Sequence, residues 1–390
     1  MVCSFRRGNL AGQRRCAAGG STLRAHGSGG KEERMDAPLL RCCSVWKASL
    51  GLHGIDLAVP RGGCTVLLGP PGAGKTGLLR LLAGFASPDA GRVLLEGGPV
   101  ERPPPGWGGF GMVQPIDTLS RYRSVERVVT ELVLSLPAPQ RAAHVARALT
   151  QLGLDGQEPV RLGALGPVPR RRLALARALA PQPAVLLLDA PLDGLEQAVR
   201  HPLALEWRAL FRRIGITTVW ATRDPGEAML LADHIAVLAE GQVVQQGTPQ
   251  ELYDAPASAF VAGLLGENNR LPGTVMVLEE EECQVRLDCG PELWARRGDV
   301  AGPGSRCIVA VRPERVAVAA LSAEEMGEGA LPAVLRDVIF LGDHVRLLLE
   351  IGRGGALLAR RPPGGRMPRP GGPASVAWDS DVAFAFRSLR

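Results

Sequence analysis

The sequence predicts an α/β protein in which a domain with a buried parallel sheet precedes a second, β-rich domain. Residues 64–84 carry the pattern of a strand, a glycine-rich loop and a helix, in that order. Two further apolar runs, at 185–189 and 217–222, are typical of strands buried on both faces. Beyond Gly266 the pattern changes to short strands separated by turns. A chain of 390 residues also exceeds one compact core, so two domains are expected.

The glycine-rich loop predicts a phosphate-binding site. It matches G-x-x-x-x-G-K-[ST], whose glycines let backbone N–H groups close around a polyphosphate at a helix N-terminus. The pattern assigns Lys75 to the β- and γ-phosphates and the Thr76 hydroxyl to a Mg²⁺ ion. The loop residues are Gly69, Pro70, Pro71, Gly72, Ala73, Gly74, Lys75 and Thr76.

A chance glycine turn is the alternative, and the lysine content argues against it. Only three of the 45 basic residues are lysine: Lys31, Lys47 and Lys75. In so arginine-rich a chain, a lysine at the position where a compact charge suits the phosphates is informative. The strand, loop, lysine, hydroxyl and helix also fall in register, which favours the phosphate site.

Composition excludes several classes of function. The net charge is +6, of which residues 1–36 account for +4, so the rest gives no electrostatic case for nucleic acid binding. The eight cysteines lack C-x-x-C spacing, which indicates reduced thiols in a cytosolic protein rather than disulfides or a zinc site. No apolar run is long enough to span a bilayer, so a membrane role requires a partner.

The N-terminal segment is excluded from the predicted fold. Residues 1–36 are rich in Gly, Arg and Ser and lack apolar periodicity, which indicates a disordered tail. Met35 offers the alternative of a mis-assigned start. Arg6-Arg7 and Arg14-Arg15 weakly suggest a twin-arginine signal, but no hydrophobic segment follows either pair.

Three residues outside the loop have candidate roles at the same site. Trp46, in an alternating stretch that predicts antiparallel strands, could stack on adenine, although a tryptophan buried in a strand fits the spacing equally well. Gln114 follows the strand predicted at 110–113 and its carbonyl could reach the nucleotide's metal. Asp189 ends a buried strand, and such a carboxylate commonly holds Mg²⁺ through water.

Helices are predicted in three places in the middle of the chain. Residues 124–136, 141–152 and 170–180 have helical patterns, with 137–140 expected as a turn between the first two.

With these residues in place, the chain resembles the ATP-binding subunit of an ABC importer, most closely the spermidine/putrescine type. LLGPPGAGKT is similar to the family's Walker A motif, and LALARALAPQPAVLLLD to the signature helix that leads into Walker B. EGQVVQQGTPQELYDAPASAFVAGLLGENNRLPG, at 240–273, resembles this importer branch specifically. VRPERV at 311–316 and VIFLGDHVRL at 338–347 resemble the regulatory domain at the C-terminus of such subunits.

The resemblance implies a fold and a set of partners. It implies a P-loop NTPase of the ABC type with a helical subdomain at 37–266, and an oligonucleotide-binding-like (TOBE) regulatory domain at 267–390. It also implies ATP and Mg²⁺ as cofactors, integral-membrane permease subunits, a second nucleotide-binding subunit in a head-to-tail dimer, and indirectly a periplasmic solute-binding protein. The resemblance also implies a cytoplasmic protein that is peripheral on the inner face of the cell membrane. Trp46 lies at the position of the aromatic residue that stacks on adenine in this family.

The chain departs from the family pattern where hydrolysis depends on it. Ala190 stands where the family has the glutamate that polarises water, and alanine cannot do so. Arg223 replaces the histidine expected after the last core strand, and Glu196 replaces the D-loop aspartate. An ungapped alignment also puts Pro115, rather than Gln114, at the family's glutamine position.

The LSGGQ signature is replaced as well. Proline has no N–H and valine hinders backbone approach, so the helix end that donates to the γ-phosphate loses donors. The residues at the signature positions are Leu165, Gly166, Pro167, Val168 and Pro169. The sequence therefore predicts ATP binding with weak or absent hydrolysis, a pseudo-ATPase with no catalytic residue intact.

Three alternatives stay open at this point. Arg223 could stabilise transferred charge as an arginine finger does, but a base would still be missing. The chain could instead be a non-transport ATP-binding regulator, or the product of a decaying gene. A small-molecule kinase is disfavoured because no acceptor site is visible and the importer-like tail would be unexplained.

Overall fold

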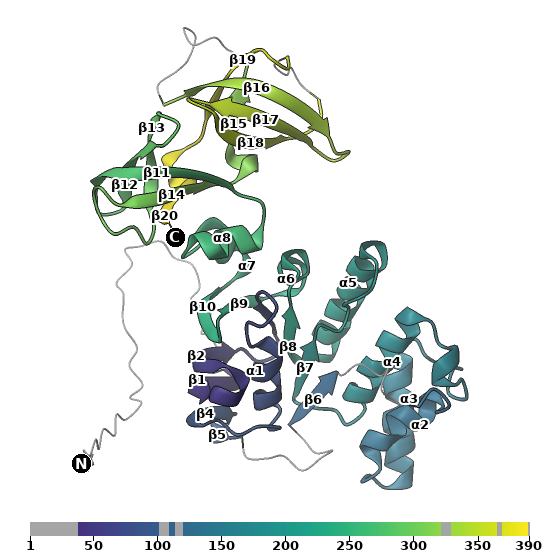
Figure 1. Ribbon diagram of the computed structural model, residues 1–390. Coiled ribbons are helices and arrows are strands. Elements are labelled where there is room, and N and C mark those ends of the chain that lie inside the picture. Colours follow the sequence, from purple (N-terminus) through teal and green to yellow (C-terminus); the bar gives the residue numbers. More distant parts are fainter. Residues whose placement is uncertain (1–37, 101–108, 114–119, 321–328, 365–368, 389–390) are drawn as a thin grey trace, which may run out of the picture. The chain divides into compact units, whose positions relative to one another are not determined.

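The computed structural model describes residues 38–100, 109–113, 120–320, 329–364 and 369–388. Gln114 and the segment expected as a tail lie outside the described residues. The described residues confirm the predicted fold class, with an α/β part followed by a strand-rich part (Figure 1).

A six-stranded sheet in the order β10-β9-β3-β8-β7-β6 forms the centre of the α/β part. Its neighbouring strands pair in parallel, except that β10 pairs antiparallel with β9. Leu67 and Leu187 face one apolar core, and Leu68 and Leu188 face another, because successive residues of a strand point to opposite faces. The strands are β3 (Cys64–Leu68), β6 (Phe110–Val113), β7 (Val185–Asp189), β8 (Thr217–Thr222), β9 (His234–Ala239) and β10 (Gln242–Gly247).

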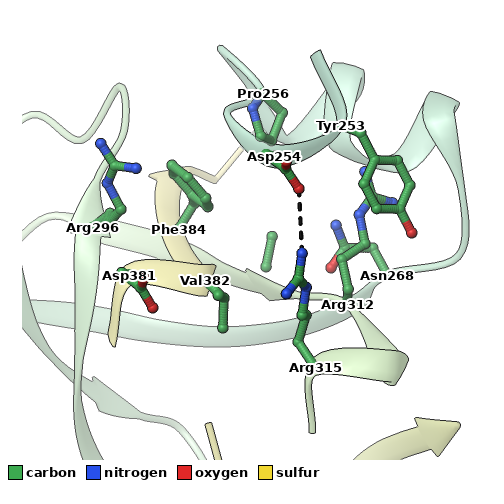
Figure 2. Close-up of a pocket in the computed structure, with 11 residues that line it drawn as sticks. Tyr253, Asp254, Pro256, Asn268, Arg296, Arg312, Arg315, Asp381, Val382 and Phe384 are labelled. Atoms are coloured by element: carbon green, nitrogen blue, oxygen red, sulfur yellow. Dashed lines mark hydrogen bonds and ion pairs between the residues drawn. The ribbon is translucent and has the colours of Figure 1, made fainter. Parts of the chain in front are cut away.

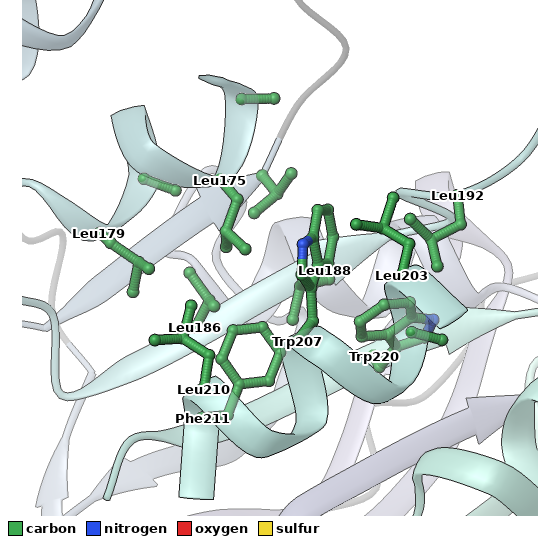
Figure 3. Close-up of a cluster of buried hydrophobic side chains, with 14 of the residues drawn as sticks. Leu175, Leu179, Leu186, Leu188, Leu192, Leu203, Trp207, Leu210, Phe211 and Trp220 are labelled. Atoms are coloured by element: carbon green, nitrogen blue, oxygen red, sulfur yellow. The ribbon is translucent and has the colours of Figure 1, made fainter. Parts of the chain in front are cut away.

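The larger of these two cores joins the sheet to two long helices, α4 (Pro167–Leu179) and α5 (Gln197–Ile214). Trp207 of α5 and Trp220 of β8 are both fully buried and meet edge to face, with ring centroids 5.9 Å apart (Figure 3). Such aromatic pairs contribute about 0.5–1.5 kcal/mol beyond the area they bury. This core holds β7 and β8 firmly, and both strands lead to the site described below.

The other core lies between the sheet and an antiparallel sheet in the order β2-β1-β4-β5. Helix α1 (Lys75–Leu82) contributes Leu78, Leu79, Leu81 and Leu82 to it. The antiparallel pairing of β1 and β2 confirms the strands predicted from the alternating stretch. The four strands are β1 (Leu40–Lys47), β2 (Leu52–Val59), β4 (Ala90–Leu95) and β5 (Gly98–Pro99).

A helical group, α2 (Val125–Thr130), α3 (Ala138–Gln151) and α4, packs together beside the sheet. Three predicted boundaries were wrong. Helix α2 ends at Thr130 and is followed by a 3-10 turn to Val133, so the helix expected at 124–136 is shorter than predicted. The turn expected at 137–140 ends at Pro137, because α3 begins at Ala138 with Pro139 in its first turn, where a missing N–H costs nothing. Helix α4 begins at Pro167 rather than at residue 170, for the same reason.

The short helix α6 (Pro225–Leu231) connects β8 to β9, whereas α7 (Pro249–Asp254) and α8 (Ala259–Leu265) follow β10. Each has a polar side chain that caps its N-terminus: Asp224, Thr248 and Ser258. Thr248 forms a full capping box with Glu251.

The strand-rich part contains a closed barrel and a five-stranded sheet that share one apolar core. The barrel consists of β11 (Asn269–Leu278), β12 (Glu282–Leu287), β13 (Glu292–Arg297), β20 (Ala383–Arg387) and β14 (Arg306–Val311). The sheet consists of β15 (Ala317–Ala319), β19 (Pro373–Ala377), β16 (Leu331–Phe340), β17 (Val345–Ile351) and β18 (Gly355–Arg361). A search of the described residues finds no helix whose length and apolar character would let it span a membrane.

Candidate functional site

A cavity of about 390 Å³ lies where β3, β7 and β8 end. Parallel strands bring their carboxyl ends to one edge of a sheet, and the loops that follow them meet there. The lining residues are Pro71 to Gly77 from the glycine-rich loop, Asp189, Ala190 and Asp193 after β7, and Ala221, Thr222 and Arg223 at the end of β8. The structure thus brings residues 71–76, Asp189, Ala190 and Arg223 of the predicted site together, whereas Trp46 and residues 165–169 do not line this cavity.

The glycine-rich loop has the backbone shape of a phosphate cradle. Gly72 and Gly74 have φ of +80° and +96°, a region that favours glycine. A Cβ on Gly69 would lie 2.2 Å from the carbonyl oxygen of Leu238, so only glycine fits there. Gly74 is the N-cap of α1, and the first turn of that helix therefore opens into the cavity.

The side chain of Lys75 reaches back to the glycine-rich loop. Its ammonium group donates to the carbonyl oxygens of Gly69, over 2.7 Å, and Pro70, over 2.8 Å. Partial burial lowers the pKa of Lys75; Asp189 opposes this shift and Arg223 adds to it. An anion in the cavity would offset the desolvation that lowers the pKa, which fits the cavity to a phosphate.

The side chains of Thr76 and Asp189 are in contact beside the glycine-rich loop. The Thr76 hydroxyl donates to Asp189 Oδ1 over 3.0 Å. A hydroxyl and a carboxylate are oxygen ligands of the kind Mg²⁺ takes, and this ion usually completes its shell with substrate phosphates and water. The pair therefore fits a Mg²⁺ ion bound together with a polyphosphate.

Ala190 presents only a methyl group to the cavity. Its backbone N–H donates to the carbonyl of Ala221 over 2.9 Å, and its φ of +43° lies in the left-handed region. The alanine side chain has no atom that can accept a proton from water. Position 190 is nevertheless held in place by the neighbouring strand.

Arg223 forms an ion pair with Asp193, with Nη2 and Oδ2 3.6 Å apart. The arginine side chain is 64 % exposed, so the pair is weak. Arg171 also donates to the backbone carbonyl of Asp193, over 2.7 Å. Asp193 was not among the residues predicted from the sequence. Its place shortly after a buried strand, like that of Asp189, is the signal that could have found it.

The chain is similar to known protein families and to individual proteins. Residues 52–193 match the family model described as ABC transporter, and residues 309–386 match the TOBE domain model. The spermidine/putrescine import ATP-binding protein PotA of Trichodesmium erythraeum is 31% identical over 366 residues, which cover 90% of this chain and 94% of that protein. The chain belongs to the family of ABC transporter ATP-binding proteins. The protein of the same name from Rubrobacter xylanophilus is 34% identical over 84% of this chain and 87% of its own.

Solved structures agree with this membership. One solved structure is that of cbiO1 from Clostridium perfringens, described as part of the ABC transporter complex cbiONQ. It matches this chain with a TM-score of 0.52 and 26% identity. The match covers 56% of this chain and 92% of that one. A nucleotide-free ATP-binding cassette from an ABC transporter has a TM-score of 0.51 at 20% identity, over 59% of this chain and 99% of that one, and shows the likeness of fold.

Residues 165–169, which the sequence predicts to stand in place of the signature, lead into the first turn of α4. Gly166 is the extended N-cap, and Pro167, Val168 and Pro169 make the first turn. Only Val168 of these three carries a backbone N–H. Leu165 is buried, and Val168 is half-buried and packs against the main core. The missing N–H groups of the prolines, rather than the bulk of the valine, therefore reduce the donors at this helix end.

Trp46 lies on the surface of β1, with 47% of the residue exposed. The alternative of a tryptophan buried in a strand does not describe this structure. Strand β1 has a register shift between Cys43 and Trp46, and Ser44 in that shift has φ of +44°. The irregularity turns Trp46 outward although regular alternation from Cys42 would bury it. The ring meets His53 edge to face at 5.7 Å, and stacking on adenine stays a prediction.

Proposed function

We propose that this protein is the ATP-binding subunit of an ABC-type importer for polyamine-like solutes, and that it binds ATP but hydrolyses it weakly or not at all. The curated relatives that match most of the chain are named for spermidine and putrescine import, which supports the solute class. We assign residues 37–266 to the nucleotide-binding domain and 267–390 to the TOBE-like regulatory domain.

The cradle formed by the glycine-rich loop carries the proposal of ATP binding. Bound ATP would supply the polyphosphate, with a Mg²⁺ ion as its counter-charge. Lys75 would turn its donors from the two loop carbonyls to the phosphates, and Thr76 and Asp189 would hold the metal. Trp46 would stack on the adenine, and Gln114 would be a further metal ligand.

The proposed loss of hydrolysis rests on three separate features of the chain. Ala190 cannot orient a water molecule. Arg223 stands where the family has a histidine, and its guanidinium group forms an ion pair with Asp193 instead. Pro167 and Pro169 remove donors from the helix end that the resemblance aligns with the signature. Preorganised donors of this kind typically contribute about two to three powers of ten in rate each, so their combined loss supports a pseudo-ATPase.

The proposed setting follows from membership of the family. We infer that the chain pairs with a second nucleotide-binding subunit, itself or a relative, and docks on integral-membrane permease subunits. A periplasmic solute-binding protein would act with them indirectly. The protein would then work in the cytoplasm, on the inner face of the cell membrane, and couple ATP binding to the permease.

An equilibrium titration of the full chain with a fluorescent ATP analogue in the presence of Mg²⁺ tests the binding step. Saturable binding is expected, and Lys75→Ala should weaken it at least about tenfold, since hydrogen bonds to charged groups are worth about 1.5–3 kcal/mol. Arg80→Ala is the matched control, because Arg80 is an exposed base on the same helix that does not line the cavity. Absence of saturable binding by the wild type would refute the proposal.

The rival assignment is a non-transport ATP-binding regulator or the product of a decaying gene, and the replaced catalytic positions are what favour it. Uptake of labelled spermidine or putrescine by the host strain, with the gene intact or deleted, separates the two. A loss of uptake restored by the wild type but not by Lys75→Ala supports the importer. Unchanged uptake together with ATP binding supports the rival.

A further inference from the structure

The ion pair of Arg223 and Asp193 lies in the wall of the cavity proposed to bind ATP. Both residues line that cavity, Arg223 at the end of β8 and Asp193 after β7. Their charged atoms are 3.6 Å apart, which is too far for a hydrogen bond. Within the residues that the structure describes, Arg223 has no second carboxylate partner. A guanidinium group has five N–H donors, so this loose contact leaves Arg223 open to a better acceptor.

The charge of Arg223 acts on the same space as that of Lys75. Besides partial burial, the charge of Arg223 lowers the pKa of Lys75, and the charges of Asp189 and Asp193 oppose the shift. Two basic and two acidic side chains thus lie within electrostatic range of one another in a cavity of about 390 Å³. Asp189 is the carboxylate assigned to the metal, which leaves Asp193 as the internal counter-charge of Arg223.

The order of the lining residues places Arg223 beyond the glycine-rich loop. Backbone N–H groups of such a loop surround the first two phosphates of a nucleotide, and the lysine reaches the second and the third. The other walls are the segments after β7 and β8, where Ala190 presents only a methyl group. Arg223 is the cation of these two segments, so a third phosphate that extends from the loop would meet it and a diphosphate would not.

We propose that Arg223 makes the site prefer a nucleoside triphosphate to a diphosphate, and that Asp193 competes with the terminal phosphate for Arg223. The inference rests on the proposed function, because it requires the cavity to bind ATP. Phosphate oxygens give the guanidinium fork a shorter, bidentate contact than the 3.6 Å pair provides. A triphosphate would therefore separate Arg223 from Asp193, whereas a diphosphate would leave the ion pair intact.

The main chain of Asp193 is held in place independently of Arg223. Its N–H donates to the carbonyl of Ala190 over 3.1 Å, and its carbonyl accepts a hydrogen bond from Arg171 of α4 over 2.7 Å. Asp193→Asn therefore removes the competing charge while the segment keeps both backbone contacts.

The test is isothermal titration of the full chain with Mg-ADP and with Mg-AMP-PNP, an ATP analogue whose imido bridge resists cleavage. Arg223→Gln should weaken AMP-PNP binding at least about tenfold, since it removes charge-assisted hydrogen bonds. Asp193→Asn should strengthen AMP-PNP binding about threefold, because an exposed ion pair contributes up to about fivefold to an equilibrium constant. Neither variant should change ADP binding more than about twofold, because ADP does not reach the pair.

Asp254→Asn is the matched control. Asp254 forms a comparable ion pair with Arg315, at 3.4 Å with side chains 43% and 50% exposed, and neither residue lines the nucleotide cavity (Figure 2). This variant should bind both nucleotides as the wild type does. Equal weakening of both nucleotides by Arg223→Gln, or no gain of AMP-PNP affinity in Asp193→Asn, would overturn the inference. A wild type that binds neither nucleotide would refute the proposed function, and this inference with it.

Discussion

Thr76 Oγ1 donates a hydrogen bond to Asp189 Oδ1 over 3.0 Å, although 113 positions separate the two residues in the chain. The contact joins the first turn of α1 to the end of β7. Strand β7 is itself fixed by Leu186 and Leu188, which are fully buried in the core that contains Trp207 and Trp220. The packing of the sheet therefore determines the spacing of the two oxygens proposed to hold the metal.

Thr76→Ala should remove most of the effect of Mg²⁺ on ATP binding. The hydroxyl is half of the proposed metal site, and we expect the Mg²⁺-dependent part of the affinity to fall about tenfold or more. The measurement is a nucleotide titration with Mg²⁺ and with a chelator. Thr76→Ser keeps the hydroxyl and should restore the dependence, whereas a full Mg²⁺ effect in Thr76→Ala would contradict the assignment.

Ala190→Glu combined with Arg223→His should fail to restore rapid ATP turnover. Position 190 already holds a residue with a Cβ at φ of +43°, so glutamate adds no new backbone strain. The helix end at Pro167–Pro169 would still lack donors, which are worth about two to three powers of ten in rate per group. Phosphate release under saturating Mg-ATP is the measurement.

Turnover should recover only when the signature is rebuilt as well. The third variant adds four substitutions to the double variant, and its phosphate release is compared with those of the double variant and the wild type. The substitutions are Gly166→Ser, Pro167→Gly, Val168→Gly and Pro169→Gln. Rapid hydrolysis by the double variant or by the wild type would show that the pseudo-ATPase interpretation is wrong.

ATP should change the fluorescence emission of the protein through Trp46. The exposed indole is free to meet a planar ring, and stacking would alter its surroundings. Trp207 and Trp220 are fully buried, so replacing them to isolate Trp46 would damage the core. We therefore expect the ATP-induced change to be lost in Trp46→Phe and kept in Trp294→Phe, whose tryptophan is exposed in the barrel. A change that survives in Trp46→Phe would exclude the stacking role.

Glu227 should make the stability of the protein depend on pH. The residue is 2% exposed, and burial raises the pKa of its carboxyl, against hydrogen bonds from Thr222 and Trp220 that lower it. A raised pKa in the folded state means that the contribution of this group is present below its ordinary pKa and is lost as pH rises through the raised value. Glu227→Gln cannot ionise, so the variant should not lose stability in this way as pH rises. The free energy of unfolding of the variant minus that of the wild type should therefore increase with pH from about 4.3 upward.

Urea unfolding across a series of pH values measures the effect. Glu126→Gln is the control, because Glu126 is an exposed glutamate in the first turn of α2, as Glu227 is in the first turn of α6. A stability difference between Glu227→Gln and wild type that does not vary with pH would contradict the prediction.

The glycine-rich loop could be predicted from sequence because its requirements are local. Gly72 and Gly74 need positive φ, and Lys75 and Thr76 need only to follow them into the helix. The end of β7 at Asp189 was equally clear, since an apolar strand stops there. Such features depend on neighbours within a few residues, which a sequence pattern contains.

Features that depend on distant contacts could not be read in the same way. The ion pair of Asp193 is formed with Arg223, which lies thirty positions later and at the end of another strand. The exposure of Trp46 rests on one irregular step in β1 at Ser44, which reverses the face of every residue after it.

The two prolines at the start of α4 also leave that helix end with a single measurable hydrogen. Pro167 and Pro169 have no amide to exchange with deuterated solvent, and the N–H of Arg170 is already bonded to the carbonyl of Gly166 over 3.1 Å. The amide of Val168 is therefore the one free exchange reporter in this first turn. A partner subunit or nucleotide that docks against it would slow exchange at that one position, so an isotope label on one residue would follow assembly of the whole interface.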